Sequence, residues 1–100
     1  MFLSKYLSNF YYQQVIMNYQ LDYLKQLDET NFIKIYNLFL KYHFNYIEDI
    51  VLKYLEIFTL DEDEVEEQII KLKEHLGNDF VSIIRKNITY LNQILQIDEM

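Results

Sequence analysis

The chain has 100 residues and a formal net charge of −7, with one glycine and no proline, cysteine or tryptophan. The lack of cysteine excludes disulfides and thiolate chemistry and is typical of a reducing, cytoplasmic compartment. A net negative charge argues against direct nucleic-acid binding, and no uncharged apolar run reaches the roughly 18 residues that a transmembrane helix needs.

The scarcity of turn-forming residues predicts the fold class. A strand-rich domain of this size needs a turn about every 8–12 residues, usually built with glycine, proline, asparagine or aspartate. One glycine and no proline cannot supply those turns, whereas apolar residues make up 51% of the chain and can fill a core. We therefore predict an all-α fold in one domain over residues 1–100, a compact antiparallel bundle of four to six helices.

The first predicted helix covers residues 2–27. Its apolar residues recur at steps of three and four, which is helical periodicity, although the stripe that they form is broad and drifts around the helix. Residues 28–31 then read as a turn, with Thr30 as the N-cap of the next helix.

The second predicted helix covers residues 32–44 and is apolar nearly all round, which is typical of a central helix. We expect His43 to be a partly buried residue of this helix. Asn45 and Glu48 have the spacing of a capping pair, which would begin a third helix over residues 46–58. The alternative is one continuous helix from residue 32 to residue 58, and the sequence leaves both open.

The fourth predicted helix has the clearest signals at both ends. It begins at Glu62 with Asp61 as its N-cap, and it ends near Leu76, where Gly77 supplies the left-handed residue that often follows a helix. A last helical region follows, capped by Asn78 or Asp79. We expect a break in it at Asn87 and fraying over residues 98–100.

Acidic side chains are concentrated in the C-terminal part, residues 61–100. Residues 1–60 carry five basic and six acidic side chains, whereas residues 61–100 carry four and ten. The densest cluster would form an acidic patch of Asp61, Glu62, Asp63, Glu64, Glu66 and Glu67. It lacks the central glycine of an EF-hand loop, so we interpret it as a solvated helix start or as a surface that meets a basic partner.

No residue pattern predicts catalysis. The chain has no glycine-rich phosphate loop and no nucleophile elbow around a serine. His43 and His75 lie far apart in the sequence without the spacing of a metal site. We therefore expect no enzyme, no cofactor and no metal site.

Tyrosine is the remaining unusual feature, because all of the tyrosines except Tyr90 lie in the N-terminal part, before Asp61. Tyrosine is enriched at protein interfaces, since its large ring carries a polar tip. Part of the excess can reflect codon usage, because the scarcity of alanine, glycine, proline and arginine indicates an AT-rich genome. We expect an exposed aromatic face with these partner-binding residues: Tyr11, Tyr12, Tyr19, Tyr23, Tyr42 and Tyr46.

These patterns favour two functions. The first is a non-enzymatic protein-interaction module, either a regulator, an inhibitor or a small subunit, that binds a protein partner or forms a homo-oligomer through its aromatic face. The alternative is an acidic decoy that imitates nucleic-acid charge and blocks a DNA- or RNA-binding protein. Salt distinguishes them, because it weakens a charge-driven complex steeply and an aromatic interface little.

Overall fold

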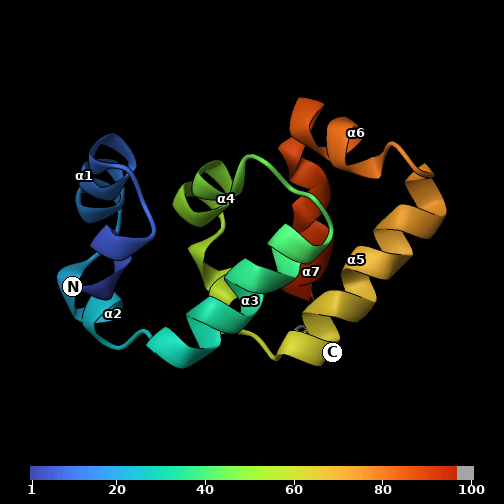
Figure 1. The fold of residues 1–100 in the computed structure, drawn as a ribbon. Helices are drawn as coiled ribbons and strands as arrows, with labels where there is room; N and C mark the ends of the chain where they lie inside the picture. Colours follow the sequence, from blue (N-terminus) through green and yellow to red (C-terminus); the bar gives the residue numbers. More distant parts are fainter. Residues whose placement is uncertain (97–100) are drawn as a thin grey trace.

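The computed structural model describes residues 1–96, which form helices joined by short connections (Figure 1). Within this range there are seven α-helices, three 3₁₀-helices and no strand, so the prediction of an all-α fold is confirmed. The molecule measures 37 × 29 × 20 Å, which confirms that the fold is compact. The elements are η1 (Phe2–Lys5), α1 (Asn9–Asn18), α2 (Leu21–Lys25), α3 (Glu29–Lys41), α4 (Ile47–Lys53), η2 (Leu55–Thr59), α5 (Glu62–Leu76), α6 (Phe80–Lys86), η3 (Ile88–Leu91) and α7 (Asn92–Leu95).

The prediction of one helix over residues 2–27 is wrong, because this segment divides into η1, α1 and α2. The backbone is extended at Ser8, with φ −62° and ψ 160°, and again at Tyr19 and Gln20. The breaks follow from the drifting apolar stripe, since they let Leu3, Val15 and Leu24 all reach the core, each at most 2% exposed. Aromatic and β-branched residues have middling helix propensity, so tertiary packing decides where these short helices end. This division raises the number of helices above the expected four to six.

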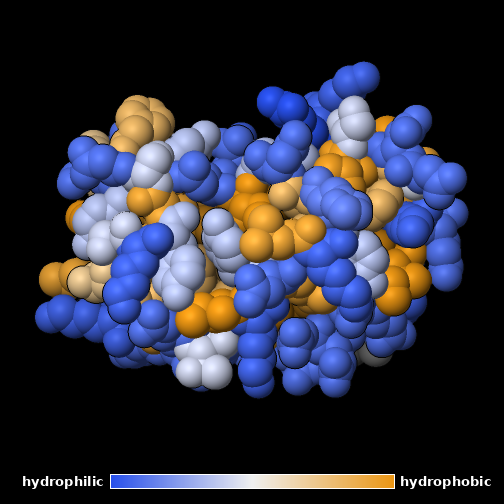
Figure 2. All heavy atoms as spheres, in the orientation of Figure 1, coloured by the Kyte–Doolittle hydropathy of each residue, from blue (hydrophilic) through white to orange (hydrophobic). Residues whose placement is uncertain are grey.

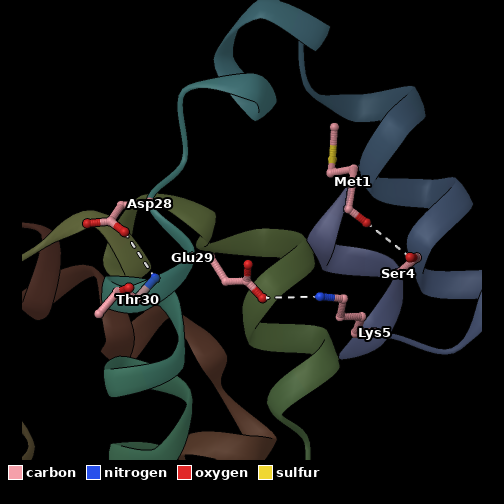
Figure 3. Close-up of polar contacts among 6 residues, drawn as sticks. All are labelled: Met1, Ser4, Lys5, Asp28, Glu29 and Thr30. Carbon is pink, nitrogen blue, oxygen red and sulfur yellow. Dashed lines mark hydrogen bonds and ion pairs between the residues drawn. The ribbon is translucent and has the colours of Figure 1, made fainter.

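The N-cap of α3 is Asp28, two residues before the predicted Thr30. The Asp28 Oδ1 atom accepts a hydrogen bond from the Thr30 backbone N–H at 3.0 Å (Figure 3). Aspartate and threonine are both good N-cap residues. Asp28 comes first along the chain, and the helix begins directly after it.

The prediction that α3 is the central helix is confirmed. It packs against α4, η2 and α5, and its buried residues recur at helical spacing: Phe32, Ile35, Leu38 and Phe39. The helix ends at Lys41, and His43 has a positive φ of 68° that turns the chain toward α4. Two separate helices are therefore present, and the continuous alternative is excluded. His43 lies exposed after the helix, contrary to the prediction of a partly buried helical residue.

The predicted capping pair of Asn45 and Glu48 is wrong. The N-cap of α4 is Tyr46, with no side-chain cap bond. Glu48 instead uses its carboxylate to accept a hydrogen bond from the Ser8 backbone N–H at 2.7 Å. A long-range partner has thus replaced the local one. The α-helix also ends at Lys53, short of the predicted residue 58, and the chain continues as the 3₁₀-helix η2.

The predictions for α5 are confirmed at both ends. Asp61 accepts from the backbone N–H groups of Asp63 and Glu64, at 3.1 and 3.2 Å. Gly77 follows the last residue with φ 88°. The predicted break at Asn87 is also present, between α6 and η3. Asp79 precedes α6 without a side-chain cap bond, and the fraying predicted for residues 98–100 lies outside the described residues.

The core is one cluster of buried apolar side chains around α3. At its centre, the Phe32 ring lies 4.9 Å from Phe58, 5.3 Å from Phe2 and 5.4 Å from Tyr6, measured between ring centroids. The accessible surface is 6267 Å², close to the roughly 6,100 Å² expected for a monomer of this mass. The chain therefore buries the area that an average monomer of its size buries.

Candidate functional site

The six predicted partner-binding tyrosines lie in separate parts of the fold. Tyr11 and Tyr12 are on α1, and Tyr23 on α2 stacks against Tyr19, with ring centroids 6.0 Å apart. Tyr42 and Tyr46 belong to the connection between α3 and α4. Tyr46 is buried, and the other five are partly buried. The structure therefore brings Tyr19 and Tyr23 together but forms no single patch of all six.

Hydroxyl groups of these tyrosines hold the helices to one another. The Tyr11 hydroxyl donates to Asp49 Oδ1 at 2.7 Å, and the Tyr19 hydroxyl donates to the Leu52 carbonyl at 2.8 Å. Both bonds join α1 and its C-terminal end to α4. The Tyr46 hydroxyl donates to the Val81 carbonyl of α6 at 2.7 Å, and burial raises the pKa of this phenol. The Tyr23 hydroxyl is also buried, and it has no hydrogen-bond partner among the described residues.

Glu66 joins α5 to the end of α3. Lys41 Nζ lies 2.7 Å from Glu66 Oε2, and the Tyr42 hydroxyl donates to the same oxygen at 2.7 Å. The hydrogen bond from the Lys41 ammonium, followed by that from Tyr42, lowers the pKa of the Glu66 carboxyl. The same contacts raise the pKa of both donors. Glu66 thus has a structural task within the acidic patch.

The lowered pKa of Glu66 predicts a pH dependence of stability. Ionised Glu66 stabilises the fold, and this contribution is complete above the pKa of an unfolded glutamate and is lost as the pH falls through the lowered, folded-state pKa. We expect Glu66→Gln to flatten the loss of stability on the acid side, because glutamine does not titrate. Urea unfolding followed by circular dichroism between pH 3 and pH 7 measures this.

Glu67→Gln is the matched control. Glu67 is a neighbouring exposed glutamate whose Oε1 atom lies 3.6 Å from Lys71 Nζ, and exposed pairs of this kind contribute little. Both variants remove one negative charge, so a general effect of net charge is common to them. Identical pH profiles for the two variants would contradict the assigned role of Glu66.

The acidic patch is partly committed to the fold. Asp61 caps α5, Glu66 binds Lys41 and Tyr42, and Glu67 pairs with Lys71. Asp63 and Glu64 are exposed in the first turn of α5, and Glu62 beside them is partly exposed. Carboxylates in a first turn also stabilise the positive end of the helix dipole. Three of the six residues of the patch are Glu62, Asp63 and Glu64. Within residues 1–96 their side chains make no hydrogen bond or ion pair to another helix.

The structure exposes apolar side chains on the N-terminal elements that the sequence patterns did not predict. Phe10 is 66% exposed, Met17 76%, Leu21 54% and Ile16 38%. We call these four residues the N-terminal apolar face. Figure 2 shows apolar atoms protruding at the upper left, over the end of the molecule that carries α1. A signal was present in the sequence, because residues 6–21 contain no charged side chain.

A groove adjoins this face between α1, α2 and the N-terminal segment. Its volume is about 510 Å³, and Tyr12, Leu21 and Leu24 are among its lining residues. Tyr12 is one helical turn from Ile16, so the groove continues the N-terminal apolar face. Tyr12 thus lies beside the exposed apolar residues, and so does Tyr11, whose ring centroid is 5.5 Å from that of Phe10.

The remaining candidate chemistry is dispersed. His43 and His75 are both exposed, and no three His, Cys, Asp or Glu side chains within residues 1–96 are placed to hold one metal ion. None of the helices in that range combines the length and the apolar character needed to cross a bilayer.

In comparisons with protein-family models, curated proteins and solved structures, the chain matches none.

Proposed function

We propose that the chain is a non-enzymatic protein-interaction module, a regulator, inhibitor or small subunit, that binds through the N-terminal apolar face. One observation carries this proposal. Five of the seven large apolar side chains that are exposed in the described residues lie between Met1 and Leu21, in a segment nearly free of charge. Interface centres are depleted of charged residues and enriched in aromatic residues and methionine.

The tyrosines contribute to this function by shaping the surface. The hydrogen bonds from Tyr11 and Tyr19 to α4 hold α1 in place, so the outer side of α1 keeps one orientation relative to the core. A preorganised surface loses less conformational entropy on binding than a flexible one. Tyr12 supplies aromatic area beside the face itself.

A double substitution tests the proposal. Phe10→Glu with Met17→Glu places two charges at the most exposed apolar positions, so we expect binding to fall about 100-fold or more while helicity stays unchanged. The measurement compares what the immobilised wild-type chain and the double variant retain from a cell lysate to which a tagged second copy of the chain is added, with quantitative mass spectrometry as the readout.

Leu40→Glu with Ile70→Glu is the matched control, because these two exposed apolar residues lie outside the N-terminal face, on α3 and α5. The control adds the same charge and should retain what the wild type retains. Equal retention by all three proteins would refute the proposed function.

An acidic decoy is the second candidate function, and the exposed acids Asp63 and Glu64 at the start of α5 are the observation in its favour. It has less support, because Asp61, Glu66 and Glu67 are engaged within the fold. A decoy complex would weaken steeply between low and high salt and would be insensitive to Phe10 and Met17.

A further inference from the structure

The outer side of α1 has the arrangement of a contact surface. Val15 is fully buried and fixes the inner side of the helix. Phe10 and Met17 are seven residues apart, which is close to two helical turns, so they lie on one line along the opposite side. Gln13 lies between them and is exposed. Two large apolar side chains therefore flank an amide on the solvent side of α1.

The charge distribution favours a second copy of this chain as the occupant. Two molecules that each carry −7 repel one another, so they associate most easily away from the acidic patch. The two acids nearest α1, Glu48 and Asp49, accept hydrogen bonds from Ser8 and Tyr11. Figure 1 shows α1 and α5 on opposite sides of the molecule, whose longest dimension is 37 Å. This longest dimension is several times the roughly 8 Å Debye length at physiological salt. The acidic patches of two copies that meet at α1 would thus be screened from each other.

The composition of the surface is also self-complementary. A two-fold symmetric contact places the same patch on both copies, so a patch with charges of one sign would oppose itself. Residues 6–21 carry no charged side chain. Lys5 and Asp22 bound this uncharged stretch. Lys5 lies 3.6 Å from Glu29 at the start of α3 (Figure 3), and Asp22 follows Leu21 in α2 and is exposed. The Gln13 amide has both a donor and an acceptor and can pair with its own copy across a two-fold axis.

The exposed apolar area is large enough to form the centre of an interface. Each of the four side chains of the N-terminal apolar face exposes on the order of 100 Å² at the fractions given above. Together they supply about 400 Å², about half of the roughly 800 Å² that each partner contributes to a standard interface, so polar residues around them would contribute the rest. An external partner of opposite charge would find its complement on α5 instead.

We propose that the N-terminal apolar face is a homodimer interface in which α1 packs against α1 of a second copy around a two-fold axis. This inference rests on the proposed function and names its partner. It predicts the sign of a salt effect. Because α1 itself carries no charged side chain and the two molecules repel, added salt should tighten the dimer, whereas salt weakens complexes between opposite charges.

Sedimentation equilibrium with light scattering tests the inference on the purified chain at low and high salt. We expect the mass to rise from 12.4 kDa toward twice that value with concentration, at lower concentration in high salt. Phe10→Glu with Met17→Glu should raise the dissociation constant about 100-fold or more, and Leu40→Glu with Ile70→Glu should change it little. A monomer mass up to millimolar concentration, or a dimer unaffected by the Phe10 and Met17 pair, would overturn the inference.

Single cysteines give a second readout that does not depend on variant stability, because the chain has no cysteine of its own. Gln13→Cys should form an intermolecular disulfide much faster than Ile70→Cys under mild oxidation, since the proposed two-fold axis places residue 13 beside its own symmetry mate. Equal rates would contradict the α1 contact. A monomer whose double variant still loses retained proteins would overturn the homodimer and leave the proposed function standing, whereas unchanged retention would remove the proposed function as well.

Discussion

We expect the replacement of Phe32 by alanine to lower the free energy of unfolding by about 3–5 kcal/mol, the range for truncating a buried aromatic side chain. Phe32 is 1% exposed, and its ring is surrounded by Phe2, Tyr6 and Phe58. The alanine leaves a cavity where η1, α3 and η2 meet, so all three lose packing at once. Since a domain is typically stable by about 5–15 kcal/mol, this single change removes a large part of the total. Guanidinium unfolding followed by circular dichroism measures it.

Phe10→Ala is the matched control, because it deletes the same atoms from a ring that is 66% exposed. We expect its effect to stay within about 0.5 kcal/mol. If Phe32→Ala does not fold, Phe32→Leu should fold with a smaller loss, on the order of 1–2 kcal/mol. Equal stability of the Phe10 and Phe32 alanine variants would contradict the central position assigned to Phe32.

Replacing Gly77 by alanine is expected to cost about 1–3 kcal/mol through backbone strain. Gly77 has φ 88° and ψ −169°, a region of backbone conformation that is essentially restricted to glycine. A Cβ atom built at this position would meet nothing within 4 Å. The cost therefore comes from the backbone of the residue itself, and the measurement is the change in the denaturant midpoint at constant m-value.

Chirality provides the control for Gly77. A D-alanine at position 77, introduced by chemical ligation, prefers the mirror-image backbone region and should be as stable as glycine or slightly more stable. The exposed helical change Glu74→Ala should shift stability by no more than about 0.5 kcal/mol. Destabilisation by D-alanine equal to that by L-alanine would show that bulk, and not φ, decides this position.

The sequence predicted most accurately where local chemistry decides the structure. In α5, the cap at Asp61 and the terminus at Gly77 both lie where predicted, because a cap satisfies backbone N–H groups two and three residues away and needs no distant partner. The central position of α3 was also predictable, since a helix that is apolar nearly all round has to be buried.

The prediction failed where a distant partner competes with a local one. Glu48 had the spacing to cap α4, yet its carboxylate accepts from Ser8, 40 residues earlier in the chain. The segment of residues 2–27 had helical periodicity throughout, yet the breaks at Ser8 and Tyr19 let it fold around α3 and α4. Neither the distant hydrogen bond of Glu48 nor the two helix breaks can be predicted from residues a few positions away in the sequence.

The candidate site was predicted only in part. The tyrosine content pointed to the N-terminal part of the chain, which carries the N-terminal apolar face, but four of the six predicted tyrosines donate their hydroxyls to other helices, for example to Asp49 and Val81. The exposed apolar residues are Phe10 and Met17 instead. An aromatic residue on an amphipathic helix can face either way, and the orientation of α1 against α4 decides which residues remain outside.

The amino-acid sequence alone thus determined the helical class, the ends of α5, the burial of α3 and the concentration of negative charge in residues 61–100, because each follows from composition or from contacts within a few residues. Only the tertiary structure decided the breaks near Ser8, Tyr19 and Tyr54, the use of tyrosine hydroxyls as links between helices, and the side of α1 that faces solvent. These depend on contacts between residues far apart in the sequence, where packing and hydrogen bonding outweigh the small differences in local helix propensity.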